Sequence, residues 1–435
     1  MAFAYRTESD TLGNGLRVIT VELPHLHQGL LSVYVRAGSR HETPAKSGVS
    51  HFLEHLFFRG SERFPDSAAM HAAVEDAGGN LNGYTSRDHG VYFTPLYPSG
   101  LPVVCEVLGD VLAAPLLERP AEVELERQVI LEEMLDEVDD RGRDIDLENL
   151  TKRTLWRGHP LALKIAGTPQ TVRRLRIPDL VAHHRRWYGA RNLVLCAAGP
   201  LEHGRVLELA DRHFGRLHRG RRATERPPPR APAGPVLHVF DHDESQTEFR
   251  LSFVAPPESH PDFLALVLVR RILDDGLSSR LPFEIVERRG LCYSVHCGID
   301  GYDDVSVFEV EGAASHGKVA RAIREICRIL GRLAREGPTR EELERAKLRH
   351  RMALEFTLDS AWDLAAWFGG TALFREPPTL EGRAEAVDAV GAAELVEVSR
   401  RILRRSNLTV TAVGSPTQRQ RAAMKAAVLE ADELD

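Results

Sequence analysis

Apolar residues recur along the first half of the chain with two spacings, the alternation of strands and the three-to-four-residue period of helices. Turn residues such as the Gly78-Gly79 pair separate these runs. The predicted elements are strands at 12–22, 30–36, the second part of 80–95 and 192–199, and helices from Ser47 or Ser50 to Gly60, from Asp66 or Ser67 to Asp76, at 102–114, 120–139, 145–156 and 178–188. This mixture of elements predicts an α+β fold.

The second half of the chain repeats the same kinds of element. Residues 406–414 match residues 191–199 position by position in pattern, at an offset of 215. The expected elements are strands at 236–240, 248–254, 291–295 and 305–310, and helices at 262–273, 316–335, 339–358 and from Ser360. A repeat at half the chain length indicates an internal duplication. We therefore expect two homologous α+β domains, at residues 1–218 and 235–435, each a mostly antiparallel sheet flanked by helices.

The segment between the two halves, residues 219–234, is rich in proline and arginine. Proline excludes a helix or an inner strand there. The composition predicts a stiff, basic linker exposed to solvent.

The composition excludes several classes of protein. With 43% hydrophobic and 27% charged residues among 435, the chain is typical of an ordinary globular protein. A net charge of −7 gives no reason to expect nucleic acid or an anionic membrane as partner. The absence of a long apolar run predicts no membrane span and, as the default, a cytoplasmic protein. Five sparse cysteines without C-x-x-C spacing predict small buried side chains, so any metal should be held by histidine and carboxylate.

The candidate chemistry lies in residues 51–55, His-Phe-Leu-Glu-His. In a helix, His51 and His55 share one face with Cβ atoms roughly 5–6 Å apart, which suits two nitrogen ligands of one zinc ion. Glu54 shares that face and can address a metal-bound water. The pattern H-x-x-E-H is the inverse of the H-E-x-x-H zinc motif, although packed or solvated histidines also show this spacing. The other helical histidines, His183, His184 and His213, have no such pattern and are expected at the surface.

A second candidate feature is the acidic helix at 120–139. On a helical wheel Val123, Ile130 and Met134 form an apolar stripe, Glu126, Glu133 and Glu137 border it, and Glu132 points away. Carboxylates at the edge of an apolar face are costly unless a cation receives them, and zinc would do so. A solvated acidic helix is the alternative, and the wheel does not separate Glu133 from Glu137.

The third feature is the polar, glycine-containing stretch at residues 80–85 (Asn-Leu-Asn-Gly-Tyr-Thr). Its composition suits an edge strand that another backbone can approach. An exposed edge can accept an extended peptide as a further strand. An ordinary hairpin is the alternative interpretation.

Together these motifs resemble those of the inverted-zinc metallopeptidases of the pitrilysin and mitochondrial-processing-peptidase family (M16), in particular its short two-domain bacterial members. The resemblance spans the whole chain. Its motifs are His51–His55, 79–88, 126–133 and, in the second half, 276–281 and 289–295. It implies two domains that enclose a substrate chamber, and a zinc-dependent endopeptidase that hydrolyses peptides or unfolded segments bound as an edge strand.

The resemblance also assigns roles to single residues. It implies one Zn²⁺ per chain, held by His51, His55 and Glu133. It makes Glu54 the general base and Glu126 a carboxylate behind the ligands. The substrate strand would lie along Asn80, Asn82, Gly83, Tyr84 and Thr85, with Tyr293 from the second domain.

One position departs from the family pattern. The family often carries an arginine seven residues before the tyrosine at 293, and this chain has Val286 there. We therefore expect the zinc-bearing chain of a homodimer, or of a heterodimer whose other chain carries the arginine and tyrosine pair. The alternative is a non-catalytic peptide-binding or structural subunit of the same fold.

Overall fold

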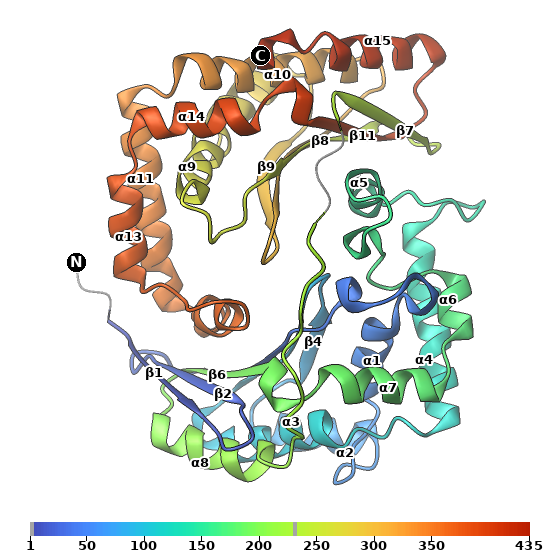
Figure 1. Ribbon diagram of the computed structural model, residues 1–435, viewed down its shortest axis with the longest axis vertical. Coiled ribbons are helices and arrows are strands. Elements are labelled where there is room, and N and C mark those ends of the chain that lie inside the picture. Colours follow the sequence, from blue (N-terminus) through green and yellow to red (C-terminus); the bar gives the residue numbers. More distant parts are fainter. Residues whose placement is uncertain (1–3, 229–232) are drawn as a thin grey trace. The chain divides into compact units, whose positions relative to one another are not determined.

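The computed structural model describes residues 4–228 and 233–435, which form two compact units (Figure 1). Unit 1 comprises Met1–Met134, Leu163–Arg226 and Ala353–Glu381, and unit 2 comprises Leu135–Ala162, Pro227–Met352 and Gly382–Asp435. Each unit is thus built mainly from one half of the chain and takes one segment from the other half.

Unit 1 is a six-stranded sheet covered by helices. Its strands are β1 (Arg6–Thr11), β2 (Arg17–Glu22), β3 (Gly29–Val35), β4 (Asn82–Thr85), β5 (Gly90–Leu96) and β6 (Leu193–Gly199), in the order β1-β2-β6-β3-β5-β4. Only the β2–β6 pair is parallel. Its helices are α1 (Val49–Phe57), α2 (Ser67–Asp76), α3 (Leu101–Ala113), α4 (Pro120–Glu133), α6 (Pro169–Arg174), α7 (Ile177–Trp187), α8 (His203–Phe214) and α12 (Ala361–Ala365). The strand β4 is the last in the order, which confirms the predicted edge.

Unit 2 has a five-stranded sheet. Its strands are β7 (Val236–Asp241), β8 (Thr247–Ala255), β9 (Val295–Gly301), β10 (Ser306–Ala314) and β11 (Leu408–Gly414), in the order β7-β11-β8-β10-β9. Its helices are α5 (Leu147–Leu155), α9 (Phe263–Leu273), α10 (Val319–Glu336), most of α11 (Arg340–Phe356), most of α13 (Leu380–Ala389), α14 (Ala392–Ile402) and α15 (Gln418–Leu429). The β7–β11 pair is parallel and the other pairs are antiparallel.

The two sheets have equivalent topologies, as the repeat in the sequence predicts. β6 and β11 start 215 residues apart, and each lies between a parallel and an antiparallel neighbour. An asparagine directly precedes each of these two strands, Asn192 before β6 and Asn407 before β11. The Asn192 amide donates to the carbonyls of Arg36 (3.0 Å) and Trp187 (2.8 Å), and the Asn407 amide donates to those of Val254 and Ile402, both at 2.9 Å.

The exchanged segments occupy equivalent places in the two units. Helix α5 comes from the first half and packs on β8 and β11, whereas α12 comes from the second half and packs on β3 and β6. Lys152 on α5 is 1% exposed and pairs with Glu309 at 3.2 Å. In unit 1 the turn after α12 brings Gly369 against Tyr34 and Cys196. Each sheet therefore depends on a helix from the other half of the chain.

Several element ends differ from those that the sequence predicts. Helix α1 begins after Gly48, not at a serine cap, and ends at Phe57 before Gly60. Helix α4 ends at Glu133, and a 3-10 turn, Met134–Glu137, follows it. The strand predicted at 291–295 is wrong, because β9 begins only at Val295.

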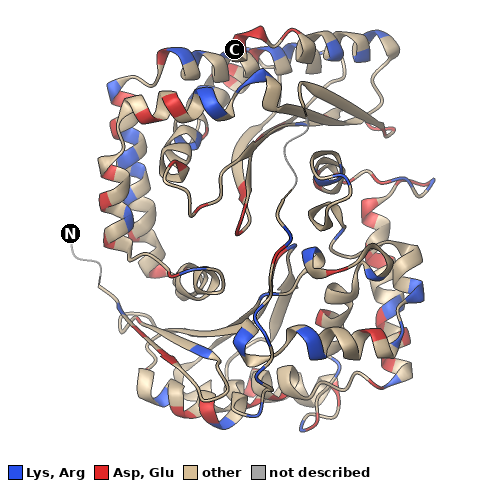
Figure 2. Ribbon diagram, viewed as in Figure 1, with Lys and Arg blue, Asp and Glu red and all other residues tan. Residues whose placement is uncertain are grey.

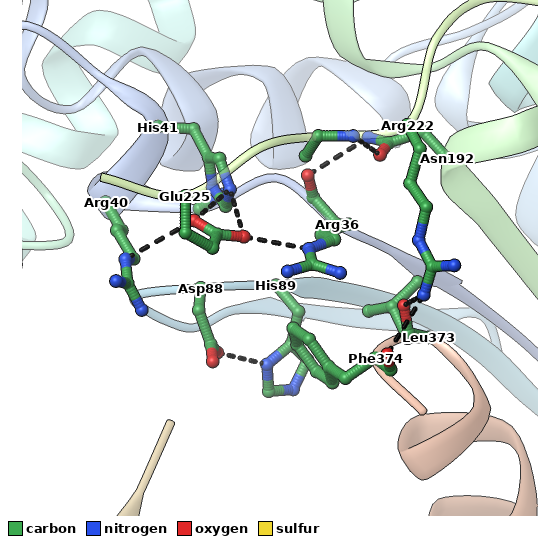
Figure 3. Close-up of polar contacts among 12 residues, drawn as sticks. Arg36, Arg40, His41, Asp88, His89, Asn192, Arg222, Glu225, Leu373 and Phe374 are labelled. Atoms are coloured by element: carbon green, nitrogen blue, oxygen red, sulfur yellow. Dashed lines mark hydrogen bonds and ion pairs between the residues drawn. The ribbon is translucent and has the colours of Figure 1, made fainter. Parts of the chain in front are cut away.

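Within the first part of the predicted linker, most side chains of residues 219–228 are exposed, but that of Glu225 is held by unit 1. Figure 3 shows Arg36, Arg40 and His41 around Glu225. The Glu225 carboxylate accepts from Arg36 Nε at 2.8 Å and lies 3.3 Å from Arg40 Nε. Burial opposes its charge, but His41 and Arg36 lower the pKa of Glu225 to about 2. Residues 229–232 of the linker lie outside the described residues.

Other predictions from composition agree with the described residues. All five cysteines are free and buried. Among these residues, no helix is both long and apolar enough to cross a membrane. In Figure 2, acidic and basic residues are interspersed along the helices of each unit.

Candidate metal centre

The site is built on α1, whose first turn is held by a carboxylate from the preceding loop. Gly48 adopts a left-handed φ of 94°, and its backbone N–H donates to Glu42 Oε2 at 2.7 Å. The N–H of Ser50 donates to the other oxygen of Glu42 at 2.8 Å. Glu42 thereby binds two backbone donors of the helix terminus that would otherwise lack acceptors. The apolar face of α1 is buried through Val49, Phe52, Leu53, Leu56 and Phe57.

The histidines of α1 converge with the last residue of α4. The Glu133 Oε2 atom lies 3.5 Å from His55 Nε2 and 3.8 Å from His51 Nε2. One ligand atom from each of the three residues lies within 4.8 Å of the other two. Two ligands of a tetrahedral zinc ion are roughly 3.3–3.4 Å apart when each bond is about 2.0–2.1 Å. Two imidazoles and one carboxylate at these distances therefore fit zinc. Of the three glutamates Glu132, Glu133 and Glu137, the cluster contains Glu133.

The protonation state of His51 agrees with a ligand role. Burial, together with the neighbouring His55, lowers the pKa of His51 to about 4. Its imidazole is therefore neutral near neutral pH, which a metal ligand must be.

A second carboxylate, Glu126, lies behind His55. Its Oε2 atom is 2.8 Å from His55 Nδ1, and its other oxygen accepts from Arg59. Burial opposes the charge of Glu126, but His55 and Arg59 hold the pKa of this carboxyl below its ordinary value. A carboxylate on one ring nitrogen fixes the orientation of the imidazole and leaves the other nitrogen for a metal. The Glu126 contact directs His55 Nε2 toward Glu133 in this way.

The remaining acid of the motif, Glu54, contacts the edge strand. Thr85 of β4 donates a hydrogen bond from its hydroxyl to Glu54 Oε2 at 2.6 Å. Burial raises the pKa of Glu54, against the opposing effect of this hydrogen bond. A carboxylate with a raised pKa is a better proton acceptor near neutral pH.

The other predicted substrate residues divide between the two units. Asn80, Asn82, Gly83 and Tyr84 lie on or beside β4, in the same unit as the cluster. Tyr293 belongs to unit 2 and is 90% exposed.

The arginine expected at position 286 has no substitute at its neighbours. Val286 packs against the core of unit 2. Arg288 and Arg289 both pair with Glu284, at 3.0 and 3.4 Å.

Some residues around the site were missed or misplaced by the sequence analysis. His183 was expected at the surface, but it is buried with its Nε2 3.0 Å from Ser50 Oγ, below α1. Arg59 follows His55 by four residues, so the helical period could have placed it beside the site. Glu42 lies only six residues before Gly48, but no pattern in the sequence marked it as an acceptor for the start of α1.

Comparisons with known proteins show the family to which the chain belongs. The family model described as insulinase (peptidase family M16) matches residues 17–169, and the model described as peptidase M16 inactive domain matches residues 174–349. An uncharacterized zinc protease of Mycobacterium bovis is 32% identical over 93% of this chain and 92% of its own length. The chain belongs to peptidase family M16.

Other M16 relatives include a probable mitochondrial-processing peptidase subunit beta of Schizosaccharomyces pombe, 28% identical over 94% of this chain and 92% of its own length. Among solved structures, a protease from Helicobacter pylori has a TM-score of 0.85 at 23% identity, covering 94% of this chain and 99% of that one. A peptidase M16 inactive domain from Pseudomonas fluorescens has a TM-score of 0.86 at 20% identity, covering 95% of this chain and 98% of that one. These structures confirm the α+β fold with two domains.

Proposed function

We propose that this M16 chain is a zinc-dependent endopeptidase with one Zn²⁺ per chain, held by His51, His55 and Glu133. The observation that carries the proposal is the convergence of two imidazole nitrogens and one carboxylate oxygen within 4.8 Å. Relatives named as zinc proteases and as a peptidase subunit support the peptidase class. Location in the cytoplasm stays a prediction.

Bound zinc would lower the pKa of a water molecule and polarise a peptide carbonyl. The residues of the chain provide the proton transfers. Glu54 accepts the proton of the attacking water at a carboxylate oxygen and delivers it to the leaving amine. Thr85 holds the Glu54 carboxylate through its hydroxyl at 2.6 Å. Glu126 orients His55 through Nδ1.

The substrate would bind as an extended strand along β4. Among the described residues this strand pairs with β5 alone and is the last in the sheet order, so its other edge can bind a peptide backbone. Asn80, Asn82, Gly83, Tyr84 and Thr85 would line it. Because Thr85 contacts Glu54, a peptide on this edge passes the proposed general base.

We further propose that full activity needs a second M16-like chain, as a homodimer or a heterodimer. Val286 packs against the core of unit 2, and the nearby Arg288 and Arg289 are paired with Glu284. In a heterodimer the other chain would carry the arginine and tyrosine pair. A relative named as a beta subunit is consistent with this arrangement. A purified monomer that cleaved peptides at full rate would contradict it.

The variant Glu54→Gln tests the peptidase proposal. We expect the wild type and this variant to bind one zinc ion each by elemental analysis, and only the wild type to cleave a quenched peptide. The matched control is Glu132→Gln, an exposed position on α4 that should retain both properties. If wild type fails to cleave until an M16-like partner is added, the two-chain arrangement is supported. Zinc-loaded wild type that stays inactive with every partner would favour the non-catalytic peptide-binding or structural alternative.

A further inference from the structure

A cavity of about 470 Å³ lies in unit 1 near the end of β4 that is farther from Thr85. This volume is within the range of roughly 300–1,000 Å³ for ligand sites. Its lining combines apolar and polar side chains from three separate parts of the chain: Leu26, His27, Gln28, Leu30, Phe93, Pro95, Asp359, Ser360, Ala361 and Trp362. The cavity contains no residue that the proposed mechanism uses.

The register of the sheet connects this cavity to the edge strand. Asn82 pairs with Phe93, and Tyr84 pairs with Val91, so these four side chains share one face of the sheet. Thr85, the residue after Tyr84, points to the opposite face, where it contacts Glu54. A peptide added along β4 would therefore alternate between the proposed metal centre and the face that bears the cavity.

Trp362 lies where the edge strand meets the cavity. Its ring centroid is 4.4 Å from that of Phe93 and 6.4 Å from that of Tyr84. Trp362 and Phe93 are both only partly buried, so their ring surfaces are not fully covered within the described part of unit 1. Partly open aromatic surfaces of this kind pack well against another aromatic ring.

We propose that this cavity binds an aromatic side chain of the substrate, three to five residues from the scissile bond. The inference rests on the proposed function, because it assumes a peptide along β4 with its scissile bond near Glu54. Three to five residues of strand span about 10–17 Å at roughly 3.3 Å per residue. This span leads from the level of Thr85 to that of Asn82 and of the cavity beyond it.

The polar rim of the cavity favours tyrosine or tryptophan among aromatic residues. His27, Gln28 and Asp359 line the cavity, and all three are exposed. Such groups can bind a phenol hydroxyl or an indole N–H, which usually finds a hydrogen-bond partner when buried. Trp362 comes from the second half of the chain, whereas all the proposed catalytic groups come from the first half. On this proposal the second half therefore contributes to substrate specificity through Trp362.

The test measures peptide binding in a Glu54→Gln background, so that turnover is not required. A set of peptides of one sequence carries tyrosine or alanine at each position in turn, and cleavage by the wild type locates the scissile bond. The positions of interest are those three to five residues from that bond, on either side. We expect the tyrosine peptide to bind about ten-fold more tightly or better at one position. Trp362→Ala should reduce this preference below about three-fold, and Trp362→Phe should retain most of it.

Two further variants complete the design. Gln28→Trp fills the cavity from its exposed rim and should also remove the preference, which keeps the test open if Trp362→Ala fails to fold. Tyr97→Ala changes an exposed aromatic residue just after β5 that does not line the cavity, and it should leave the preference intact. An unchanged preference in both Trp362→Ala and Gln28→Trp, or no aromatic preference in the parent, would overturn the inference. If zinc-loaded wild type cleaved nothing while the binding preference held, the proposed function would fail and the aromatic subsite would stand.

Discussion

Replacing Glu126 by glutamine would show whether the carboxylate behind His55 tunes the metal centre. The Glu126 side chain is 4% exposed, and its two oxygens contact His55 Nδ1 at 2.8 Å and Arg59. Glutamine keeps the size and one oxygen acceptor but loses the charge and the second acceptor. Either His55 or Arg59 therefore loses its present contact.

The expected effect follows from these contacts. Loss of a carboxylate behind a metal-binding histidine typically lowers metal affinity about 10–100-fold. This corresponds to about 1.4–2.7 kcal/mol. Glu126→Ala should also destabilise the zinc-free fold, because breaking a buried ion pair costs about 3–5 kcal/mol. We expect a value near or below the lower end, since the Arg59 side chain is 31% exposed and water can solvate it.

The assay is zinc affinity by competition with a chelator, combined with urea unfolding of the zinc-free protein. Glu132→Gln, on the same helix but exposed, is the control for a change of charge alone. Zinc affinity in Glu126→Gln equal to that of wild type would refute the reasoning.

Two further predictions concern the stability of the unit that carries the site. Burial lowers the pKa of His183 to about 3 from 6.5, so the unfolded chain takes up the extra proton and stability falls as pH drops from 6.5 toward 3. The loss is up to about 1.4 kcal/mol per pH unit, so urea unfolding should show a flatter pH dependence in His183→Gln than in wild type, and equal slopes would contradict this. Gly48→Ala should destabilise by at least about 2 kcal/mol, because φ is 94° and the new Cβ would meet the Ala166 carbonyl at 2.4 Å. Gly142→Ala, with φ of 71° and no atom within 4 Å, should cost clearly less, and similar losses at both positions would refute the role of the contact.

Much of the fold and of the candidate site is predictable from local patterns. The spacing of His51 and His55 needed only a helix, and α1 provides it. The wheel placed Glu126 and Glu133 on the border of the apolar stripe, and both reach the histidines. The wheel could not separate Glu133 from Glu137, because it assumed one helix over residues 120–139. In the structure α4 ends at Glu133 and a 3-10 turn follows, so the helical period does not apply to Glu137.

Two of the interpretations that failed concern residues whose environment lies far away in the sequence. His183 has an ordinary position on a helix, yet packing places it below α1. Glu225 lies in a segment with the composition of a solvated linker, yet Arg36 and Arg40 form a buried site for it. In each case the local pattern was read correctly, but burial depended on a distant partner.

The sequence by itself determined most of the helical and strand elements, the duplication at an offset of 215, and the metal-ligand spacing on α1. These follow from side-chain periodicity and backbone preference, which act over a few residues. Only the tertiary structure decided that α5 and α12 are exchanged between the units, that His183 lies against Ser50, and that Trp362 lies beside β4. The physical reason is that such contacts join residues tens to hundreds of positions apart. They form only when the apolar faces of whole elements pack together.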